Sequence, residues 1–318
     1  MSRRVLISGS IAYDTIMVFE GHFKDHILPD RVHLLNVSFL APRLERNYGG
    51  CAGNIAYTLA GLGGEPVMLA TVGRDGDAYL AHLAGLGIDI TTVRRLDDTY
   101  TAQAFITTDL SDNQITAFHP GAMSHAHRVS VNDAHREGDE PAAIGIVAPN
   151  GRDAMLQHAR EFGESGVPFV FDPGQGLPMF DGETLRDLVS RACAVTVNDY
   201  EASLLVERTG WSEPDIARRV QALIVTRGAE GSRVYEGGRV TEIAAAPPTQ
   251  TLDPTGCGDA YRGGLLHART LGWSWTDAAR LGSVMGAIKI AHRGGQNHPV
   301  DRADVARRFE QAYGRAPW

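Results

Sequence analysis

Short apolar runs alternate with amphipathic stretches along most of the chain. Runs with the length of buried strands occur at residues 5–8, 66–72, 143–148, 167–171, 194–197 and 222–226. Helical spacing of apolar residues is found between them, at 54–62, 78–86, 152–164, 182–191, 200–209 and 260–271. Strands that are apolar throughout belong to sheets buried on both faces, and strand–helix alternation favours parallel pairing. The pattern predicts an α/β protein with a largely parallel sheet covered by helices on both faces.

Two segments interrupt this alternation, and the second of them is rich in threonine, isoleucine and phenylalanine, which favour strands. We expect these segments, 15–48 and 99–118, to form a small β lid. The main domain would then consist of 1–14, 49–98 and 119–318. Both segments lie beside motif-like residues, which favours a lid over a site. Surface hairpins without a lid role are the alternative.

Composition narrows the possible functions. The 318 residues carry a net charge of −8 and contain no run of like charge that could follow a nucleic-acid backbone or an anionic membrane. No apolar stretch approaches the length of a membrane span. We therefore expect neither a nucleic-acid nor a membrane partner. Cys51, Cys193 and Cys257 are widely spaced and form no C-x-x-C pair, which fits reduced thiols and a cytoplasmic location.

Several familiar catalytic motifs are absent from the sequence. There is no G-x-x-x-x-G-K-[ST], no protein-kinase signature and no G-x-S-x-G or H-E-x-x-H. The missing G-x-G-x-x-G opposes a nicotinamide-dependent dehydrogenase. If the protein handles phosphate, another device must bind it.

A glycine-bounded acidic motif, D-P-T-G-C-G-D-A-Y-R-G-G at 253–264, supplies such a device. Gly256 and Gly258 permit backbone geometry closed to other residues, and the free N–H groups of the following helix point outward as donors. Together with the helix dipole, they predict an anion hole. Asp259, in the first turn, is placed to accept a proton from a hydroxyl that attacks phosphorus. An acidic residue that only caps the helix is the alternative.

A second motif, G-G-C-A-G-N at 49–54, runs directly into a predicted helix. Its small residues let a ligand approach the backbone, and Asn54 offers both a donor and an acceptor. A polyol such as ribose needs this chemistry. The alternative is a glycine-rich turn in which Asn54 caps the helix.

These two motifs, in this order, resemble the signatures of the PfkB, or ribokinase, family of carbohydrate and nucleoside kinases. The resemblance covers essentially the whole chain. It implies a three-layer α/β/α sandwich with a mostly parallel central sheet and a small β lid. It also implies an ATP-dependent kinase with Asp259 as catalytic base and the backbone of Gly256, Cys257 and Gly258 as anion hole.

The resemblance extends to the acceptor pocket and the metal. Asp14, Gly50 and Asn54 correspond to the residues that hold the sugar hydroxyls. The sequence N-D-Y-E at 198–201 resembles the family's N-x-x-E, in which the position of Glu201 orients phosphate-bound Mg²⁺, mostly through water. Asp253 resembles a residue near the monovalent-cation site of some members, which adds a cation such as K⁺ to the expected cofactors ATP and Mg²⁺.

A nucleotide-binding set is implied in the same way. The sequence T-R-G-A-E-G at 226–231 resembles the family's nucleotide loop T-x-G-x-x-G. The residues expected to bind the nucleotide are Asn198, Thr226, Gly228, Gly231 and Thr255. Asn198 and Thr226 each follow a predicted strand, and ligands in open α/β sheets gather at the carboxyl ends of strands.

Further segments resemble the bacterial adenosine and nucleoside kinase branch, in which the positions of Ser10, Ser38, Phe118 and Gln175 face the nucleoside. Phe118 can stack on a purine, and Gln175 can hydrogen-bond a base edge. Ala104 replaces a second stacking aromatic of some relatives, which permits broader nucleoside use. We expect transfer of the γ-phosphate to the 5'-hydroxyl of adenosine or of a broader set of purine nucleosides.

Two other functions stay open. The first is a kinase of ribose or another simple sugar, which would use the same motifs. The second is a noncatalytic PfkB-like domain that only binds a ligand, although the presence of Asp259 and the glycine hole argues against it. A homodimer formed through the lid is a further expectation from the family.

Overall fold

The computed structural model describes residues 3–27, 36–111, 113–135, 138 and 140–318. Within this part of the chain the central sheet has eight strands in the order β14-β13-β12-β11-β10-β9-β1-β4. The parallel strands are β1 (Arg4–Ser8), β4 (Glu65–Leu69), β9 (Ile144–Val147), β10 (Phe169–Phe171), β11 (Ala194–Asn198) and β12 (Ala222–Thr226). An antiparallel hairpin, β13 (Ser232–Glu236) and β14 (Arg239–Ile243), extends one edge.

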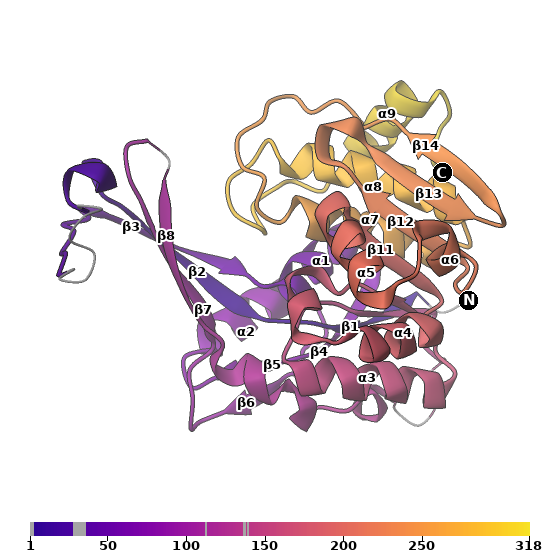
Figure 1. Ribbon diagram of the computed structural model, residues 1–318, viewed down its shortest axis with the longest axis horizontal. Helices are drawn as coiled ribbons and strands as arrows, with labels where there is room; N and C mark the ends of the chain where they lie inside the picture. Colours follow the sequence, from indigo (N-terminus) through magenta and orange to yellow (C-terminus); the bar gives the residue numbers. More distant parts are fainter. Residues whose placement is uncertain (1–2, 28–35, 112, 136–137, 139) are drawn as a thin grey trace.

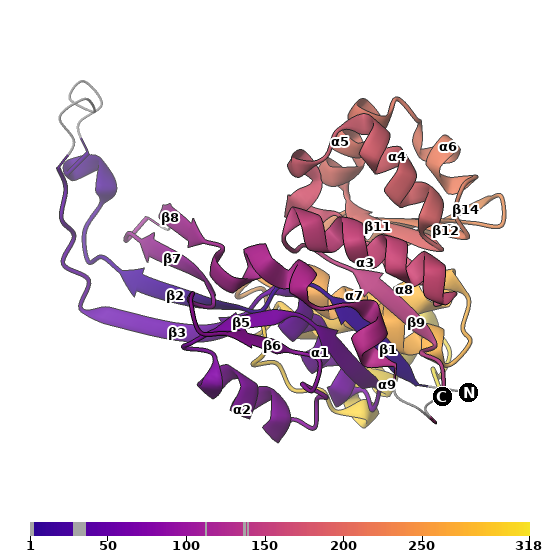
Figure 2. The ribbon, with the colours of Figure 1, turned by 90° about the horizontal axis from the view of Figure 1, so that it is seen from below.

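Helices cover both faces of this sheet, as Figure 2 shows from below. One face carries α3 (Arg152–Ser165), α4 (Gly182–Arg191), α5 (Asp199–Thr209) and α6 (Glu213–Ala217). The other carries α1 (Cys51–Gly61), α2 (Asp77–Gly85), α7 (Cys257–Thr270), α8 (Trp275–Lys289) and α9 (Arg302–Tyr313). The predicted three-layer α/β/α sandwich is confirmed. Among the described residues, none of the helices combines the length and hydrophobicity needed to cross a bilayer.

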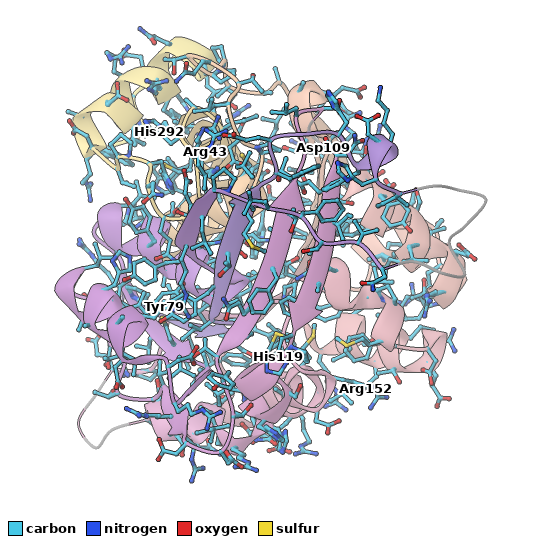
Figure 3. All side chains as sticks on the ribbon, turned by 90° about the vertical axis from the view of Figure 1, so that its left-hand side faces the viewer. Arg43, Tyr79, Asp109, His119, Arg152 and His292 are labelled. Carbon is cyan, nitrogen blue, oxygen red and sulfur yellow. The ribbon has the colours of Figure 1, made fainter. Side chains whose placement is uncertain are left out.

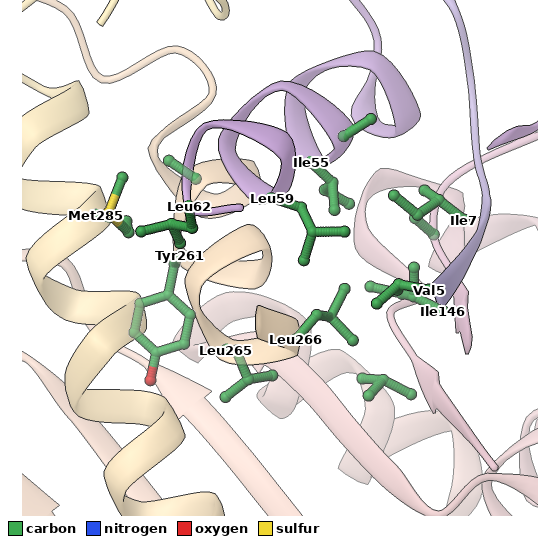
Figure 4. Packing of buried hydrophobic residues seen from close by; sticks show 14 of the residues in the cluster. Val5, Ile7, Ile55, Leu59, Leu62, Ile146, Tyr261, Leu265, Leu266 and Met285 are labelled. Atoms are coloured by element: carbon green, nitrogen blue, oxygen red, sulfur yellow. The ribbon is translucent and has the colours of Figure 1, made fainter. Parts of the chain in front are cut away.

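Two separate apolar cores hold the three layers together, because successive residues of a strand point to opposite faces. Along β1, Val5 and Ile7 belong to the core beneath α1 and α7, whereas Leu6 belongs to the core beneath α3. Figure 4 shows the first core, in which Leu59 of α1 and Leu266 of α7 pack toward β1. Burial of the strands on both faces explains why their sequences are apolar throughout.

The lid is a four-stranded sheet that projects from the main body (Figure 1). Its strands, in the order β3-β2-β7-β8, are β2 (Ala12–Val18), β3 (Arg43–Gly49), β7 (Ala102–Thr108) and β8 (Gln114–His119). Strands β2 and β7 pair in parallel, and the outer pairs are antiparallel. Figure 3 looks onto this sheet, with Arg43 and Asp109 near one end and His119 at the other. The predicted small β lid is confirmed, although its strands extend a few residues beyond the predicted segments.

Some predicted elements differ from the structure. The single strand predicted at 66–72 is wrong: β4 ends at Leu69, and β5 (Thr71–Gly73) leaves the central sheet to pair with β6 (Arg94–Leu96). Strands β13 and β14 and helices α6, α8 and α9 were not predicted. Helix α8 is buried on most of its surface, so it lacks the polar stripe on which helical spacing depends. Its start is nevertheless marked by Ser274, whose side chain accepts a hydrogen bond from the Asp277 backbone.

Candidate active site

The start of α7 carries unpaired backbone donors. Gly256 is the N-cap residue and has φ of 74°, in the left-handed region that favours glycine. This conformation turns the chain so that the next residues enter the helix. The N–H groups of Gly258 and Asp259 have no acceptor among the described residues. With the positive end of the helix dipole, they form a site suited to a phosphate group.

Asn54 of α1 holds the carboxylate of Asp259. Its Nδ2 donates to Asp259 Oδ2 at 2.8 Å, and its Oδ1 accepts from Gln296 Nε2 at 3.2 Å. Gln296 also donates to the hydroxyl of Tyr79 at 2.5 Å, which in turn donates to the Gly49 carbonyl. Because an ionised carboxylate only accepts hydrogen bonds, this network fixes the orientation of the Asn54 amide. The network thus points one oxygen of Asp259 at a defined donor.

The environment of Asp259 adjusts its basicity. Burial raises the pKa of Asp259 to about 6, while the hydrogen bond from Asn54 and the charge of Arg262 act in the opposite direction. A carboxylate with this pKa is ionised at neutral pH and is a better proton acceptor than an ordinary aspartate. Its position and its basicity both suit a general base.

A buried ion pair holds in place the first turn of α7, which forms the anion hole. Arg262 of α7 pairs with Asp172, which follows β10, and its Nη2 donates to Asp172 Oδ1 at 2.7 Å. Both side chains are almost fully buried. Arg262 Nη1 also donates to the Gly258 carbonyl at 3.0 Å. The pair therefore anchors the first turn of α7 to the end of a central strand.

A cavity of about 920 Å³ opens on the carboxylate of Asp259. It lies between the lid and the main domain. Nine of the predicted residues line it: Ser10, Asp14, Gly50, Asn54, Phe118, Gln175, Thr255, Gly256 and Asp259. The structure thus brings together residues from β2, α1, β8, α7 and the short helix η5 (Gly174–Met179).

The lid contributes one face of its sheet to this cavity. Asp14 pairs with Ala104 across β2 and β7, and Ala104 pairs with Phe118 across β7 and β8. Residues directly opposite one another in a sheet point to the same side. Phe118 is 49% exposed, and the small side chain of Ala104 leaves open space beside it.

The carboxylate of Asp14 faces the cavity without a hydrogen-bond partner among the described residues. Loss of water, with a contribution from the negative charge of Asp253, raises the pKa of Asp14 to about 6. Ser10 accepts a hydrogen bond from the Cys51 backbone at 3.1 Å, so its own hydroxyl hydrogen is free to reach a ligand. Both residues are poised for a ligand that carries hydroxyl groups.

A second cavity, of about 450 Å³, lies on the other side of the α7 N-terminus. Thr226, Gly228 and Gly231 line it, as predicted for a nucleotide loop, together with Cys257 and Gly258 at the start of α7. The remaining lining is largely small and apolar and includes Ala229, Ala245, Ala246, Pro247, Pro248 and Ile290. This surface suits a flat aromatic base. The two cavities meet at residues 255–259.

Other predicted residues lie elsewhere. Asn198 and Glu201 form a reciprocal capping box at the start of α5 and line neither cavity. Thr255 was expected to bind the nucleotide, but it lines the larger cavity and not the second one. Ser38 is exposed in the segment before β3 and lines neither cavity. Both oxygens of Asp253 already accept backbone hydrogen bonds, from Thr255 and from Gly294.

Sequence reasoning missed Asn150 and Arg262. Asn150 is 2% exposed, lines the larger cavity, and its Nδ2 has no partner in the described structure. A buried amide donor without a partner suggests that a bound ligand accepts its hydrogen bond. Its position just after an apolar strand was the available signal. Arg262 belongs to the acidic motif itself, but its partner Asp172 is 90 residues away in sequence.

These features define the class: a helix-terminal anion hole and a buried base between two ligand cavities belong to a small-molecule phosphotransferase. Comparison with known proteins identifies the family. Residues 4–302 match the pfkB family of carbohydrate kinases, and the chain belongs to that family.

Two of the similar proteins are nucleoside kinases. The chain is 30% identical over 279 residues to a nucleoside kinase of Methanocaldococcus jannaschii, covering 87% of this chain and 90% of the relative. The solved structure of the nucleoside kinase of Burkholderia thailandensis in complex with inosine is 50% identical, with a TM-score of 0.86. That match covers 98% of this chain and 99% of the other. The structure of the Methanocaldococcus jannaschii enzyme is 28% identical, with a TM-score of 0.87 and coverage of 97% and 98%.

Proposed function

We propose that the protein is an ATP-dependent nucleoside kinase that transfers the γ-phosphate to the 5'-hydroxyl of a purine nucleoside. The observation that carries the proposal is the position of Asp259 where the two cavities meet. A nucleoside in the larger cavity and ATP in the smaller one would meet at the start of α7. The complex of the Burkholderia thailandensis relative with ADP and inosine supports this pairing of ligands.

In this mechanism Asp259 accepts the proton of the attacking hydroxyl. The N–H groups of Gly258 and Asp259, together with the dipole of α7, stabilise the charge on the transferred phosphoryl oxygens. Asn54 orients the carboxylate, and Arg262 fixes the backbone of Gly258. These contacts preorganise the site before the ligands arrive.

A nucleoside is favoured over free ribose because of the chemistry beyond the sugar pocket. Asp14 and Asn54 could hold ribose hydroxyls in either substrate. Phe118, Gln175 and the unpaired amide of Asn150 line the same cavity and would have no partner on a free sugar. The space beside Ala104 supports use of several purine nucleosides, adenosine and inosine among them.

We further propose that the reaction uses Mg²⁺. Mg²⁺ neutralises triphosphate charge and keeps several waters, so it needs few protein carboxylates. In the described part of the chain no group of three or more His, Cys, Asp or Glu side chains is arranged to hold a metal ion. Glu201 fits a role in which it orients metal-bound water without binding the metal directly. Its Oε2 accepts a hydrogen bond from the Asn198 backbone, and its Oε1 has no partner among the described residues.

The lid supports the expected homodimer. Phe105 and Ile115 lie on the face of the lid sheet opposite Phe118, and Leu44 shares that outer face by register. These three side chains are 41%, 43% and 62% exposed. A second copy covering this apolar face would remove it from water. Use of ATP, together with three unpaired cysteines, supports a cytoplasmic location.

A substrate panel tests the proposed function. Purified protein is incubated with Mg-ATP and, in separate reactions, adenosine, inosine, cytidine, ribose and fructose, and the phosphorylated product is identified by mass spectrometry. We expect 5'-monophosphates of the purine nucleosides. Asp259→Asn protein, purified in parallel, controls for contaminating kinases. Higher kcat/KM for a sugar would favour the ribokinase alternative, and binding without turnover would favour a ligand-binding protein.

A further inference from the structure

Lys289, the last residue of α8, is fully buried beneath the anion hole. Its Nζ donates to the carbonyl oxygens of Asp253 and His292, each at 3.0 Å. The same nitrogen lies 3.7 Å from Asp253 Oδ2. An ammonium group has three N–H donors and no acceptor, so these three oxygens match its bonding capacity.

The oxygens around Nζ belong to the two segments that border the active site. Asp253 begins the anion-hole motif, and its Oδ1 accepts from the Thr255 backbone at 2.8 Å. Its Oδ2 accepts from the backbone of Gly294, at 2.8 Å, in the segment that follows α8. Lys289 thus joins the chain entering α7 to the chain leaving α8. Its Cε also lies close to Gly256, the N-cap of α7.

A charge in this position is costly unless it is paired, since burial removes it from water. Here the carboxylate of Asp253, two carbonyl oxygens and the negative end of the α8 dipole all face the ammonium group. The arrangement is that of a cation site built from oxygen ligands. Lys24, the other lysine in the sequence, is exposed and makes no comparable contacts in the described structure.

The resemblance of Asp253 to a residue of a monovalent-cation site predicted a bound ion such as K⁺. The residues present do not fit a free ion beside Asp253, because the oxygens that would bind it are already occupied by Nζ of Lys289. K⁺ and an ammonium group are similar in size and carry the same charge. Nζ of Lys289 therefore occupies the position that a bound K⁺ would take in this cage, formed by the carbonyl oxygens of Asp253 and His292 and by Asp253 Oδ2.

We propose that Lys289 is a built-in replacement for the monovalent cation, which positions the anion hole and makes the enzyme independent of K⁺. Its fixed charge lies behind Gly256 and favours a phosphate group at the start of α7. Lys289 acts through the backbone of 253–257 and touches no substrate, so it is a positioning residue. The consequence for turnover rests on the proposed kinase function, whereas occupancy of the cage by Nζ does not.

The first experiment uses the wild-type protein. Initial rates are measured with Mg-ATP and inosine in potassium, rubidium, ammonium or tetramethylammonium chloride at constant ionic strength. We expect the same kcat and KM in all four salts. The melting temperature should be equally insensitive to the choice of cation. Strong activation or stabilisation of the wild-type protein by K⁺ would overturn the proposal.

The second experiment empties the cage. Lys289→Ala leaves a space of the right size for a free cation, whereas Lys289→Met fills much of that space with an uncharged chain. Loss of this supporting contact should lower kcat by about 10- to 100-fold in both variants. K⁺ or NH₄⁺ should restore most of the activity of Lys289→Ala and little of that of Lys289→Met. Lys24→Ala, which removes an exposed lysine, should behave as wild type.

A merely structural lysine would give a different result, because no cation would restore the folded Lys289→Ala variant. Two readouts do not depend on turnover. Rubidium or thallium soaked into crystals should give an anomalous peak beside Asp253 in Lys289→Ala but not in the wild type. K⁺ should also raise the melting temperature of Lys289→Ala alone. If these two results appear while no substrate is phosphorylated, the proposed function fails and the cation replacement stands. A peak beside Asp253 in the wild type would overturn the replacement.

Discussion

Asn54 and Asp259, 205 residues apart in sequence, form a hydrogen bond of 2.8 Å that joins the N-termini of α1 and α7. Each residue lies in the first turn of its helix, after a glycine with positive φ. The two glycine-rich motifs are therefore halves of one structure. The first supplies the donor that orients the carboxylate, and the second supplies the carboxylate and the anion hole.

Asp259→Asn keeps the size of the side chain but removes the proton acceptor. If Asp259 is the general base, kcat should fall by about 10²-fold or more. Binding of nucleoside, measured by calorimetry without ATP, should be largely retained because the cavity keeps its shape. A variant with near-normal kcat would show that Asp259 only caps α7.

Asn54→Ala tests the role of the hydrogen bond through the pH profile. In the wild type, kcat/KM should fall with decreasing pH through about 6, as Asp259 becomes protonated. The Asn54 hydrogen bond lowers this pKa, so its removal should move the acid limb to higher pH. Thr58→Ala removes another buried polar group from α1, one that contacts His298, and should leave the limb in place. Equal shifts in both variants would point to a general disturbance of α1.

The parts of the fold that were predicted depend on local patterns. Strand β1 is apolar because both faces are buried, and Gly256 marks the start of α7 through its own backbone conformation. The end of β4 at Leu69 was not predictable, because the apolar run continues into β5 and only pairing with β6 separates the two. The fully buried position of Lys289 likewise depends on packing between segments distant from it.

The residues of the candidate site also divide into those that local patterns predicted and those that only tertiary contacts revealed. The motif residues around Asp259 could be grouped because strand ends and helix starts meet at one edge of the sheet. The ion pair of Arg262 could not be predicted, since no sequence pattern links Arg262 to Asp172, which lies 90 residues earlier. Asn150 is similar: its unpaired amide becomes evident only when its surroundings are known. Motifs thus predicted which residues come together around the cavity, and tertiary contacts revealed what holds them in place.

Glu201→Gln tests the proposed metal role without disturbing the helix cap. Glutamine at this position can keep the capping box with Asn198, so the melting temperature should change little. The loss of charge should raise the Mg²⁺ concentration needed for half-maximal rate, because the carboxylate would no longer orient metal-bound water. KM for the nucleoside should stay the same. An unchanged Mg²⁺ titration would restrict Glu201 to its capping role.

Asp14→Asn should stabilise the protein at neutral and alkaline pH. The pKa of Asp14 is about 6 in the folded protein, above the ordinary value of 3.8, so the folded state binds more protons between these values. Stability contributed by the protonated carboxyl is present at low pH and is lost as pH rises through about 6. Removing the charge should therefore raise the melting temperature at about pH 8 but not at about pH 3.5. Asp98→Asn, at an exposed position, is the control and should show no such difference.

Phe118→Ala distinguishes a nucleoside kinase from a sugar kinase. Phe118 lines the acceptor cavity from β8, and we expect its ring to stack on the purine. Loss of stacking should remove about 1–3 kcal/mol of binding free energy, taking aromatic stacking on nucleic-acid bases as a guide. KM for inosine or adenosine should then rise by roughly ten- to a hundredfold. Any ribose activity should barely change, because Asp14 and Asn54, which we propose hold the sugar, are unaltered.

The control is Phe105→Ala, which removes the same side chain from the outer face of the same sheet, where it does not line the cavity. Its nucleoside KM should match that of the wild type once the oligomeric state has been checked by light scattering. Asp14→Ala should instead weaken ribose and nucleoside alike, since the ribose hydroxyls are common to both. A nucleoside KM unmoved by Phe118→Ala, or raised equally by Phe105→Ala, would mean that Phe118 supports the lid without contacting the base. The preference for nucleosides would then have to come from Gln175 or Asn150.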